Sequence, residues 1–234
     1  MKRKIILLLV IIFITTLLSG EEGVKTLSFS GYEWFVKEAR QPVGPGPNRF
    51  SEKSLRLDGD SLVFSLLPRS KGWLCGEVYS KDLFSYGTFT LEFSLSRELD
   101  SQGVFGFFLY NDDVPPLYNE VDFEIARWGY PLGHGASFSV QPYEREGNSL
   151  PFDSLLPGDY VCQISWEEDQ IDFSLSRKGG GIVKHWAYEG RDIPVNTQSR
   201  VHLNLWLFQG LPPAEDGGDS IELHFFSYEK NIDF

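Results

Sequence analysis

The sequence predicts an all-β fold, a sandwich or jelly roll of two antiparallel sheets, and three observations indicate this class. Apolar and polar residues alternate in many short runs, as in strands with one buried face. Gly, Pro, Asn and Asp separate these runs, and no long stretch has the period of a helix. A chain of 234 residues also has the length at which sandwiches form one core.

The strands follow from the alternation of apolar and polar side chains. In residues 88–96, for example, phenylalanines and leucines occupy every second position and Thr, Glu and Ser lie between them. Strands are predicted, in chain order, over residues 88–96, 104–110, 121–127, 137–141, 160–166, 170–176, 201–208 and 221–228. Turns are expected at residues 42–47, 115–116 and 178–181, and a surface loop at 212–218. Strands in this number are typical of a sandwich.

The N-terminal 20 residues have the layout of a secretory signal peptide. Basic residues precede an apolar run over 5–18, which ends in Ser19 and Gly20. This run is shorter than the roughly 20 residues that span a bilayer comfortably, so cleavage is favoured over the alternative, an uncleaved membrane anchor. We expect residues 1–20 to be removed and residues 21–234 to form one secreted or periplasmic domain, a monomer with no further contact to the membrane.

The charge of the chain excludes one class of partner. The formal net charge is −12 and the isoelectric point is near 4.8. Nucleic-acid binding needs Lys and Arg to displace counterions from phosphates, so we expect no nucleic-acid partner. An uncharged sugar polymer is compatible with this charge.

One predicted strand carries acids on a single face. Alternation over residues 119–127 separates three carboxylates from three apolar side chains: Glu120, Asp122 and Glu124 on one face, Val121, Phe123 and Ile125 on the other. In a chain with 33 acids among 234 residues, such a triple arises by chance about 0.6 times. The apolar face nevertheless indicates a strand fixed in a sheet, so the acids are not a disordered charge run.

Neighbouring carboxylates on one strand favour acid-base chemistry. They repel by about 1 kcal/mol at 4 Å in water and about 4 kcal/mol at a partly buried site, so we expect one pKa to rise and another to stay low. Glycoside hydrolysis uses such a pair, one acid protonated and one ionised. The outer Cα atoms lie roughly 13 Å apart, so the Glu side chains must lean inward for the retaining reaction. The alternatives are a solvated acidic face and a calcium-binding edge, although a strand supplies calcium ligands poorly.

A second strand, over residues 201–208, has one apolar face and one aromatic and polar face. Asn204 can bind a sugar hydroxyl, and Trp206 can either stack on a sugar or pack beneath another layer. The four histidines (His134, His185, His202 and His224) have no metal-ligand spacing, so we interpret each as structural and predict no metal site. Cys75 and Cys162 allow one disulfide or two buried free thiols.

These segments resemble glycoside hydrolase family 16. Residues 120–124 match the Glu-x-Asp-x-Glu signature of that family, residues 73–80 and 85–89 resemble its Cys-Gly-Glu and Tyr-Gly segment, and residues 204–206 resemble its late Asn-Leu-Trp strand. The segments occur in the order of the family, over most of the chain from about Phe29 onward.

The resemblance implies a concanavalin A-like jelly roll with a concave substrate cleft and endo-acting, retaining cleavage of a β-linked polysaccharide, with β-1,3/1,4-glucan as the leading substrate. It assigns Glu120 as the nucleophile, Glu124 as the general acid and then base, and Asp122 as the residue that tunes both. It also implies a set of substrate contacts: Glu77, Asn204, Trp206, Trp128, Asn48 and Gln141. Catalysis in the family needs no cofactor, and a structural calcium ion is compatible with the resemblance.

Two features bear on the branch of the family. No residue is inserted between Asp122 and Glu124, which resembles lichenases and xyloglucan-acting enzymes rather than the bulged laminarinase pattern. Residues 127–129, however, read Arg-Trp-Gly and depart from the lichenases, which leaves the linkage open. The rival functions are a non-catalytic carbohydrate-binding sandwich, which would be expected to lose at least one acid, and a transglycosylase with the same carboxylates.

Overall fold

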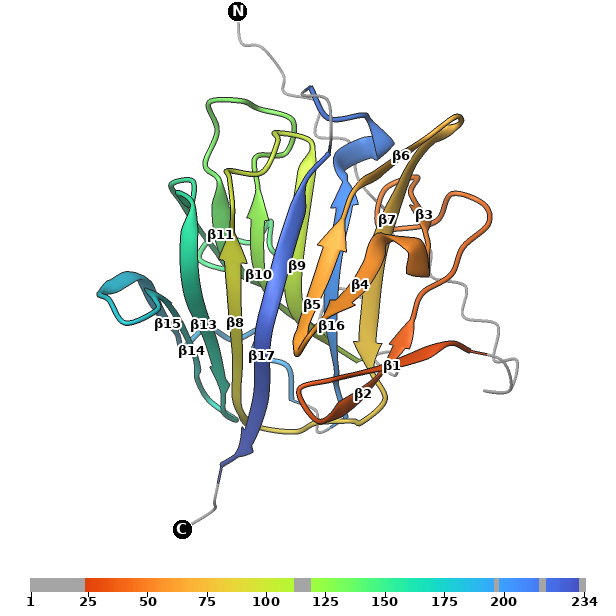
Figure 1. Cartoon of the computed structure of the whole chain (residues 1–234). Coiled ribbons are helices and arrows are strands. Elements are labelled where there is room, and N and C mark those ends of the chain that lie inside the picture. Colours follow the sequence, from red (N-terminus) through yellow and green to blue (C-terminus); the bar gives the residue numbers. More distant parts are fainter. Residues whose placement is uncertain (1–23, 112–118, 196–197, 215–217, 232–234) are drawn as a thin grey trace, which may run out of the picture.

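The computed structural model describes residues 24–111, 119–195, 198–214 and 218–231, and these form two stacked β-sheets (Figure 1). Within those ranges the helical structure is limited to two 3₁₀ turns, Glu52–Ser54 and Phe208–Gly210. No helix in the described part is long and apolar enough to cross a membrane. The predicted signal peptide, residues 1–20, lies outside the described residues.

The first sheet has ten strands. Its main path runs β1 (Thr26–Phe29), β2 (Tyr32–Val36), β7 (Gly72–Ser80), β16 (Arg200–Leu207), β9 (Gly103–Tyr110), β10 (Glu120–Ala126), β11 (Ala136–Val140) and β12 (Ser149–Phe152). The short strands β3 (Arg49–Phe50) and β6 (Leu67–Arg69) also pair with β7, β3 in parallel and β6 antiparallel. Strands β9 and β10 follow each other in the sequence, whereas β16, which pairs with β9 on its other side, comes from near the end of the chain.

The second sheet has seven strands and is antiparallel throughout. Its order is β15 (Ile182–Tyr188), β14 (Ile171–Arg177), β13 (Gly158–Trp166), β8 (Gly87–Leu95), β17 (Ser220–Lys230), β5 (Ser61–Ser65) and β4 (Leu55–Asp58). Figure 1 shows this sheet in front of the ten-stranded one. The two sheets confirm the predicted sandwich of antiparallel layers.

Each strand predicted from the sequence is present, with ends displaced by at most two residues. The predicted hairpin at 178–181 is confirmed, because the Arg177 amide donates to the Gly181 carbonyl at 3.1 Å between β14 and β15. The turn at 42–47 is also present, since Val43 and Asn48 bond to each other through their backbones. Residues 115–116, and part of the loop 212–218, lie outside the described ranges.

The core lies between the sheets and is rich in aromatic rings. Phe93 of β8 shows how it joins the two layers: its ring centroid lies 6.0 Å from those of Phe105 and Phe123 in the other sheet and 5.4 Å from that of Tyr160 in its own. All four side chains are buried. Phe123 belongs to β10, so the strand that carries the acids is fixed through its core-facing side.

We expect Phe93→Ala to lower the free energy of unfolding by about 3–5 kcal/mol, because it removes a ring that contacts both sheets and leaves a cavity. Denaturant unfolding of the purified chain measures this. Phe225→Ala is the matched control, because that ring is 44% exposed on β17 and its loss should cost less than about 1 kcal/mol. Equal losses for the two variants would contradict the described core.

The cysteine alternatives are resolved in favour of free thiols. Cys75 on β7 and Cys162 on β13 are both buried and unpaired, and they belong to different sheets. Burial raises the pKa of the Cys75 thiol to about 12 and also raises that of Cys162, so neither is a reactive thiolate at neutral pH.

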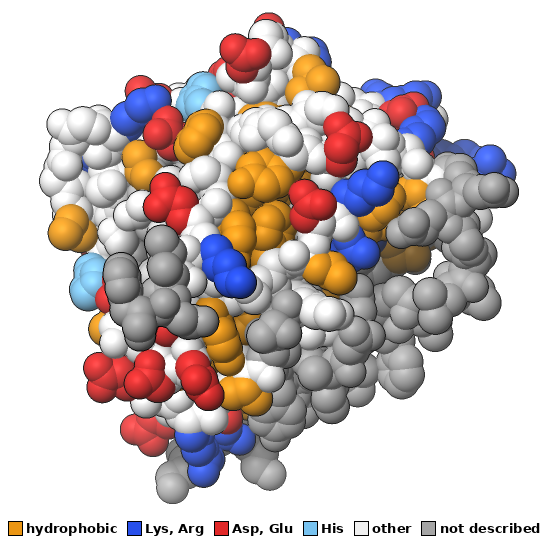
Figure 2. Space-filling view, turned by 90° about the horizontal axis from the view of Figure 1, so that it is seen from below, with side chains coloured by type: hydrophobic (Ala, Val, Ile, Leu, Met, Phe, Trp, Pro, Cys, Tyr) orange, Lys and Arg blue, Asp and Glu red, His pale blue; other side chains and the backbone are white. Residues whose placement is uncertain are grey.

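The end of the sandwich seen in Figure 2 has a mixed surface, on which acidic and basic side chains border a group of hydrophobic ones. Leu57 and Leu83 are examples of large apolar side chains that are half exposed in the structure. Apolar atoms make up much of the surface of any folded protein, so we assign no function to this end.

Candidate active site

Strand β10 presents its three acids on the outer face of the ten-stranded sheet, as the alternation predicts. Val121, Phe123 and Ile125 are buried in the core, whereas Glu120 and Glu124 are partly exposed on the opposite face. Asp122, between them, is only 3% exposed. The acids are therefore held on a rigid element and share one local environment.

Strand β11 orients the middle acid. Ser139, directly opposite Asp122 in the register, donates a hydrogen bond from Oγ to Oδ2 at 3.0 Å. Gln141 approaches the same oxygen with Nε2 at 3.5 Å, while its Oε1 accepts a bond from the Tyr143 amide at 3.1 Å. The predicted substrate contact Gln141 is thus placed against Asp122, where it orients the carboxylate.

The pKa values of the three acids do not follow the expectation that one would rise and another would stay low. Burial raises the pKa of Asp122 to about 6, although hydrogen bonds from Glu120, Ser139 and Gln141 oppose the rise. Burial, followed by repulsion from Asp122, raises the pKa values of Glu120 and Glu124 well above the usual range of a carboxyl. The expectation that one pKa would stay low was wrong, because removal of water from this face affects all three acids.

The raised pKa of Asp122 predicts a pH-dependent stability. Between about pH 4 and pH 6 the folded chain holds a proton that the unfolded chain has lost, so the free energy of unfolding falls as pH rises through that window. Asp122→Asn removes this contribution. The free energy of unfolding of the variant, taken relative to that of the wild type, should therefore rise by up to about 3 kcal/mol between pH 3 and pH 7.

Chemical denaturation of the wild type and Asp122→Asn at several pH values measures this difference directly. Two pH curves that run parallel across the window would show that the pKa of Asp122 is the same in the folded and unfolded chains. The raised pKa described above would then be contradicted.

A row of residues joins β10 to more distant strands. The register places Glu77 of β7 opposite Asn204 of β16, Asn204 opposite Gly106 of β9, and Gly106 opposite Glu124. An added Cβ at Gly106 would lie 2.7 Å from Oδ1 of Asn204, so glycine leaves room for the amide beside the acids. Gly106 is a site residue that the sequence analysis missed, since its importance depends on a partner 98 positions away in the chain.

Glu77 is ionised although it is only 4% exposed. Lys37 donates from Nζ to Oε2 at 2.7 Å, and Nδ1 of His202 lies 3.4 Å from Oε1. Burial by itself would raise the pKa of Glu77, but Lys37 and His202 outweigh it and the net pKa is lowered. The sequence analysis singled out Glu77, whereas it interpreted His202 as structural and did not single out Lys37.

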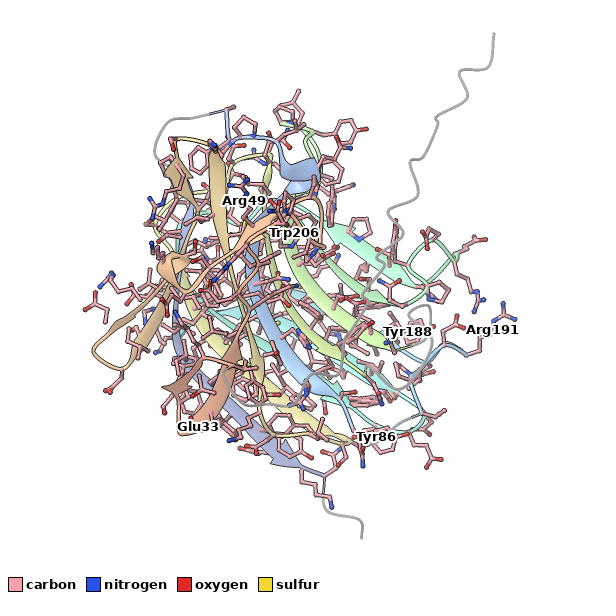
Figure 3. All side chains as sticks on the ribbon, turned by 90° about the vertical axis from the view of Figure 1, so that its right-hand side faces the viewer. Glu33, Arg49, Tyr86, Tyr188, Arg191 and Trp206 are labelled. Carbon is pink, nitrogen blue, oxygen red and sulfur yellow. The ribbon has the colours of Figure 1, made fainter. Side chains whose placement is uncertain are left out.

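The aromatic side of the predicted site is closer packed than expected. Trp206 is 8% exposed, and its ring lies 6.1 Å from that of Trp128, which contacts Phe208 at 5.5 Å. The loop before β3 also packs here (Figure 3), because a Cβ at Gly46 would lie 3.4 Å from the Trp206 indole. Packing therefore covers most of Trp206, and the partly buried Trp128 is the better placed of the two rings to stack on a sugar.

Asn48 has its polar atoms occupied by the protein. Its Nδ2 donates to the carbonyls of Leu207 at 2.8 Å and Pro45 at 2.9 Å, and the Cys75 thiol donates to Oδ1 at 3.4 Å. Asn48 thus fastens its loop to the end of β16. Of the predicted substrate contacts it has the weakest geometric support.

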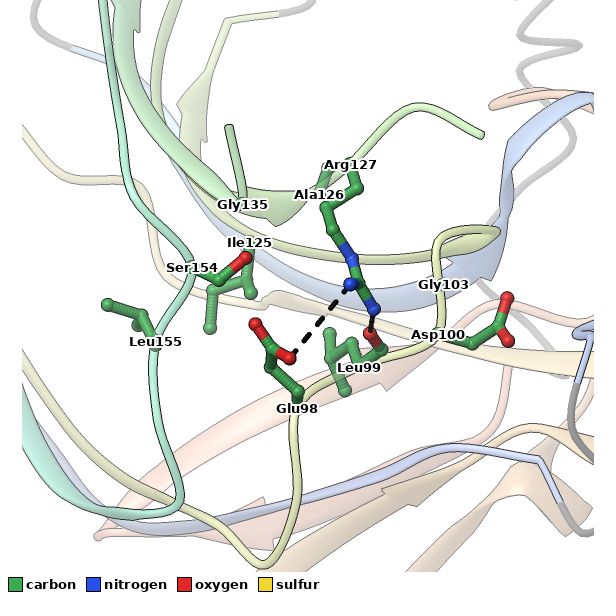
Figure 4. A pocket seen from close by; sticks show the side chains of 10 residues that line it. All are labelled: Glu98, Leu99, Asp100, Gly103, Ile125, Ala126, Arg127, Gly135, Ser154 and Leu155. Atoms are coloured by element: carbon green, nitrogen blue, oxygen red, sulfur yellow. Dashed lines mark hydrogen bonds and ion pairs between the residues drawn. The ribbon is translucent and has the colours of Figure 1, made fainter. Parts of the chain in front are cut away.

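Arg127, the residue after the end of β10, anchors this end of the strand (Figure 4). It donates to the Leu99 carbonyl, and its Nη1 lies 3.9 Å from a carboxylate oxygen of Glu98. These residues line a small recess between the end of β10 and the loop that precedes β9. This position departs from the lichenase pattern, and the contacts give it a structural role. Across the described ranges no group of three or more His, Cys, Asp or Glu side chains is placed to hold a metal ion.

Comparison with known proteins supports the fold alone. No protein-family model and no curated protein sequence matches the chain. Among solved structures, a Bacillus licheniformis β-glucanase superposes with a TM-score of 0.65 at 15% identity, over 91% of this chain and 100% of that one. A laminarinase from Flavobacterium sp. UMI-01 gives a TM-score of 0.67 at 14% identity, over 84% and 93%.

A third solved structure with this fold is a pseudo-enzyme. An immunostimulatory antigen and pseudo β-1,3-glucanase of Mycobacterium tuberculosis gives a TM-score of 0.66 at 17% identity, over 85% of this chain and 91% of that one. The chain therefore has the jelly-roll fold of the family 16 β-glucanases. Because enzymes and a pseudo-enzyme share this fold, the activity must be inferred from the site residues.

Proposed function

We propose that the chain is a secreted, endo-acting, retaining glycoside hydrolase that cleaves a β-linked polysaccharide, with β-1,3/1,4-glucan as the leading substrate. The observation that carries this proposal is the set of three carboxylates on β10, with Asp122 buried between two partly exposed glutamates. In the proposal residues 1–20 are a signal peptide, residues 21–234 are the catalytic domain, and the chain acts as a monomer.

In the proposed first step, Glu124 donates its proton to the glycosidic oxygen while the Glu120 carboxylate attacks the anomeric carbon. The bond to the leaving sugar breaks, and a covalent glycosyl-enzyme forms on Glu120. The raised pKa of Glu124 favours the protonated form that this step needs. Asp122 is placed to accept the proton of Glu120, because the two carboxyls share a hydrogen bond.

In the second step the Glu124 carboxylate takes a proton from water, and the water oxygen displaces Glu120 from the anomeric carbon. Two displacements retain the β configuration. Both steps use side chains of this chain, so the proposed mechanism needs no cofactor. If a sugar hydroxyl takes the place of water, the same intermediate gives transglycosylation, which is a variant of this mechanism.

The main rival is a carbohydrate-binding protein without activity, and the pseudo β-1,3-glucanase among the structural neighbours gives it a specific basis. The presence of all three acids, together with the Ser139 bond that orients Asp122, favours the enzyme. A pure binding surface has no need for three buried or partly buried carboxylates that repel one another.

The test is release of reducing ends from barley mixed-linkage glucan, laminarin, xyloglucan and agarose by the purified mature chain. Release from one of these polymers, lost in Glu120→Gln, would support the enzyme and identify its substrate class. Binding to a polymer with no release, even when acceptor sugars are added, would overturn the proposal in favour of the binding protein.

A further inference from the structure

His202 lies in a stack of rings on the outer face of the ten-stranded sheet. Its ring is nearly parallel to that of Tyr79 on β7, at 5.4 Å and 17°, and to that of Phe108 on β9, at 4.9 Å and 20°. Tyr110 meets it edge-on at 5.8 Å. Because the neighbouring rings cover both faces of the imidazole, only its edge, with the two nitrogens, is available for polar contacts.

Glu77 makes one nitrogen of the His202 ring a hydrogen-bond donor. Nδ1 lies 3.4 Å from Oε1 of Glu77, and that carboxylate is held by Lys37, whose Nζ also donates to the Gly44 carbonyl at 2.9 Å. An ionised carboxylate only accepts hydrogen bonds, so Nδ1 carries a proton. In the neutral imidazole the second nitrogen, Nε2, is therefore an acceptor.

That second nitrogen is buried and has no hydrogen-bond partner within the described structure. Oδ1 of Asn204, two residues along the same face of β16, is in the same state. Buried polar atoms are nearly always paired in folded proteins, and unpaired ones call for an explanation such as a catalytic role or a bound water or ion. These two atoms belong to the sheet face that carries the acids, and a sugar bound on that face would supply the missing partners.

The position relative to β10 limits the ligand. His202 is opposite Phe108, and Phe108 is opposite Asp122, so His202 and Asp122 are two strand spacings apart, roughly 10 Å. A sugar chain bound over the carboxylates must reach across this distance to contact His202. The stacked rings present their edges, which suits hydrogen bonds to hydroxyls rather than stacking on the face of a sugar.

We propose that His202 determines specificity in the glycan site, with Nε2 accepting a hydrogen bond from a hydroxyl of the sugar unit beside the carboxylates. Glu77 and Lys37 act as positioning residues that fix the tautomer and the orientation of the ring. The inference rests on the proposed function and deepens it, because it adds a contact that the sequence analysis had interpreted as structural.

Two substitutions separate this role from a structural one. His202→Gln can place an amide oxygen where Nε2 lies, whereas His202→Asn can replace only Nδ1 and its contact with Glu77. Loss of a hydrogen bond to a substrate hydroxyl should lower kcat/KM by about tenfold or more in the Asn variant, mainly through KM, and by less than about threefold in the Gln variant. His185→Asn, an exposed histidine on β15, is the matched control.

The assay uses the polymer of the panel above from which the wild type releases most reducing ends. Binding of the same polymer is measured in parallel for Glu120→Gln alone and for Glu120→Gln combined with each His202 substitution. A greater loss of kcat/KM in His202→Gln than in His202→Asn would assign a structural role through Nδ1 and overturn the inference. Wild-type kcat/KM in His202→Asn would also overturn it. A wild type that binds but does not cleave overturns the enzyme alone, and the binding series then tests His202.

Discussion

Glu120→Ala is expected to reduce cleavage of the best polymer substrate by at least about 10⁴-fold, because the proposed mechanism then lacks its nucleophile. Added azide should restore turnover by occupying the space of the carboxylate and attacking the anomeric carbon once. A single displacement inverts the centre, so the product should be the α-glycosyl azide. Reducing-sugar release and NMR of the azide product measure both effects.

Glu92→Ala is the matched control for this variant. Glu92 lies on β8 in the other sheet, where it pairs with Lys178 at 2.7 Å, so its loss should leave cleavage unchanged. Activity of Glu120→Ala within about tenfold of the wild type would remove Glu120 from the role of nucleophile. Unfolding midpoints of the two variants show whether any loss arises from misfolding.

Glu124→Ala should lower kcat/KM on the polysaccharide by about 10²–10⁴-fold, the usual effect of losing a general acid. The loss should be much smaller on aryl glycosides with good leaving groups, because these depart without a proton. Azide should now give the β-glycosyl azide, since the Glu120 intermediate still forms and is attacked from the opposite side. Rates on the two substrate types and NMR of the azide adduct provide the measurement.

The two azide products distinguish the carboxylates from each other. If Glu124→Ala gave the α-glycosyl azide and Glu120→Ala the β product, the two roles would be reversed on β10. If neither variant responded to azide and both lost the same activity on every substrate, the acids would be needed for the structure of the face rather than for chemistry.

The sequence predicted the acidic strand because every relation that defines it is local. Alternation along residues 119–127 is sufficient to place Glu120, Asp122 and Glu124 on one face, and the buried Val121 and Phe123 confirm it. The same holds for β16, whose leucines point into the core while Asn204 lies on the outer face. Side-chain period along a single strand is the most reliable signal in an all-β sequence.

The contacts across strands could not be predicted in this way. His202 and Glu77 are 125 residues apart in the chain, and their contact depends on the register between β16 and β7. The space at Gly106 likewise depends on Asn204 from another part of the sequence. Spacing rules found no metal pattern among the histidines, but they contained no information on which histidine lies on the sheet face that carries the acids.

The pKa values illustrate a second limit. Repulsion between neighbouring carboxylates can be inferred from the sequence, and it led to the expected split. Burial, which is the largest influence on all three acids in the structure, depends on the packing around the strand. The reaction still needs one ionised and one protonated glutamate, and Asp122, which shares a hydrogen bond with Glu120, is placed to take the proton of Glu120.

The most direct test of the proposed mechanism is the configuration of the first product. Proton NMR during cleavage of a β-linked oligosaccharide from the best polymer shows which anomer forms before mutarotation. The double displacement on Glu120 predicts the β-anomer first. Initial release of the α-anomer would contradict the glycosyl-enzyme intermediate, and no cleavage of any polymer would contradict the assignment of this face as an active site.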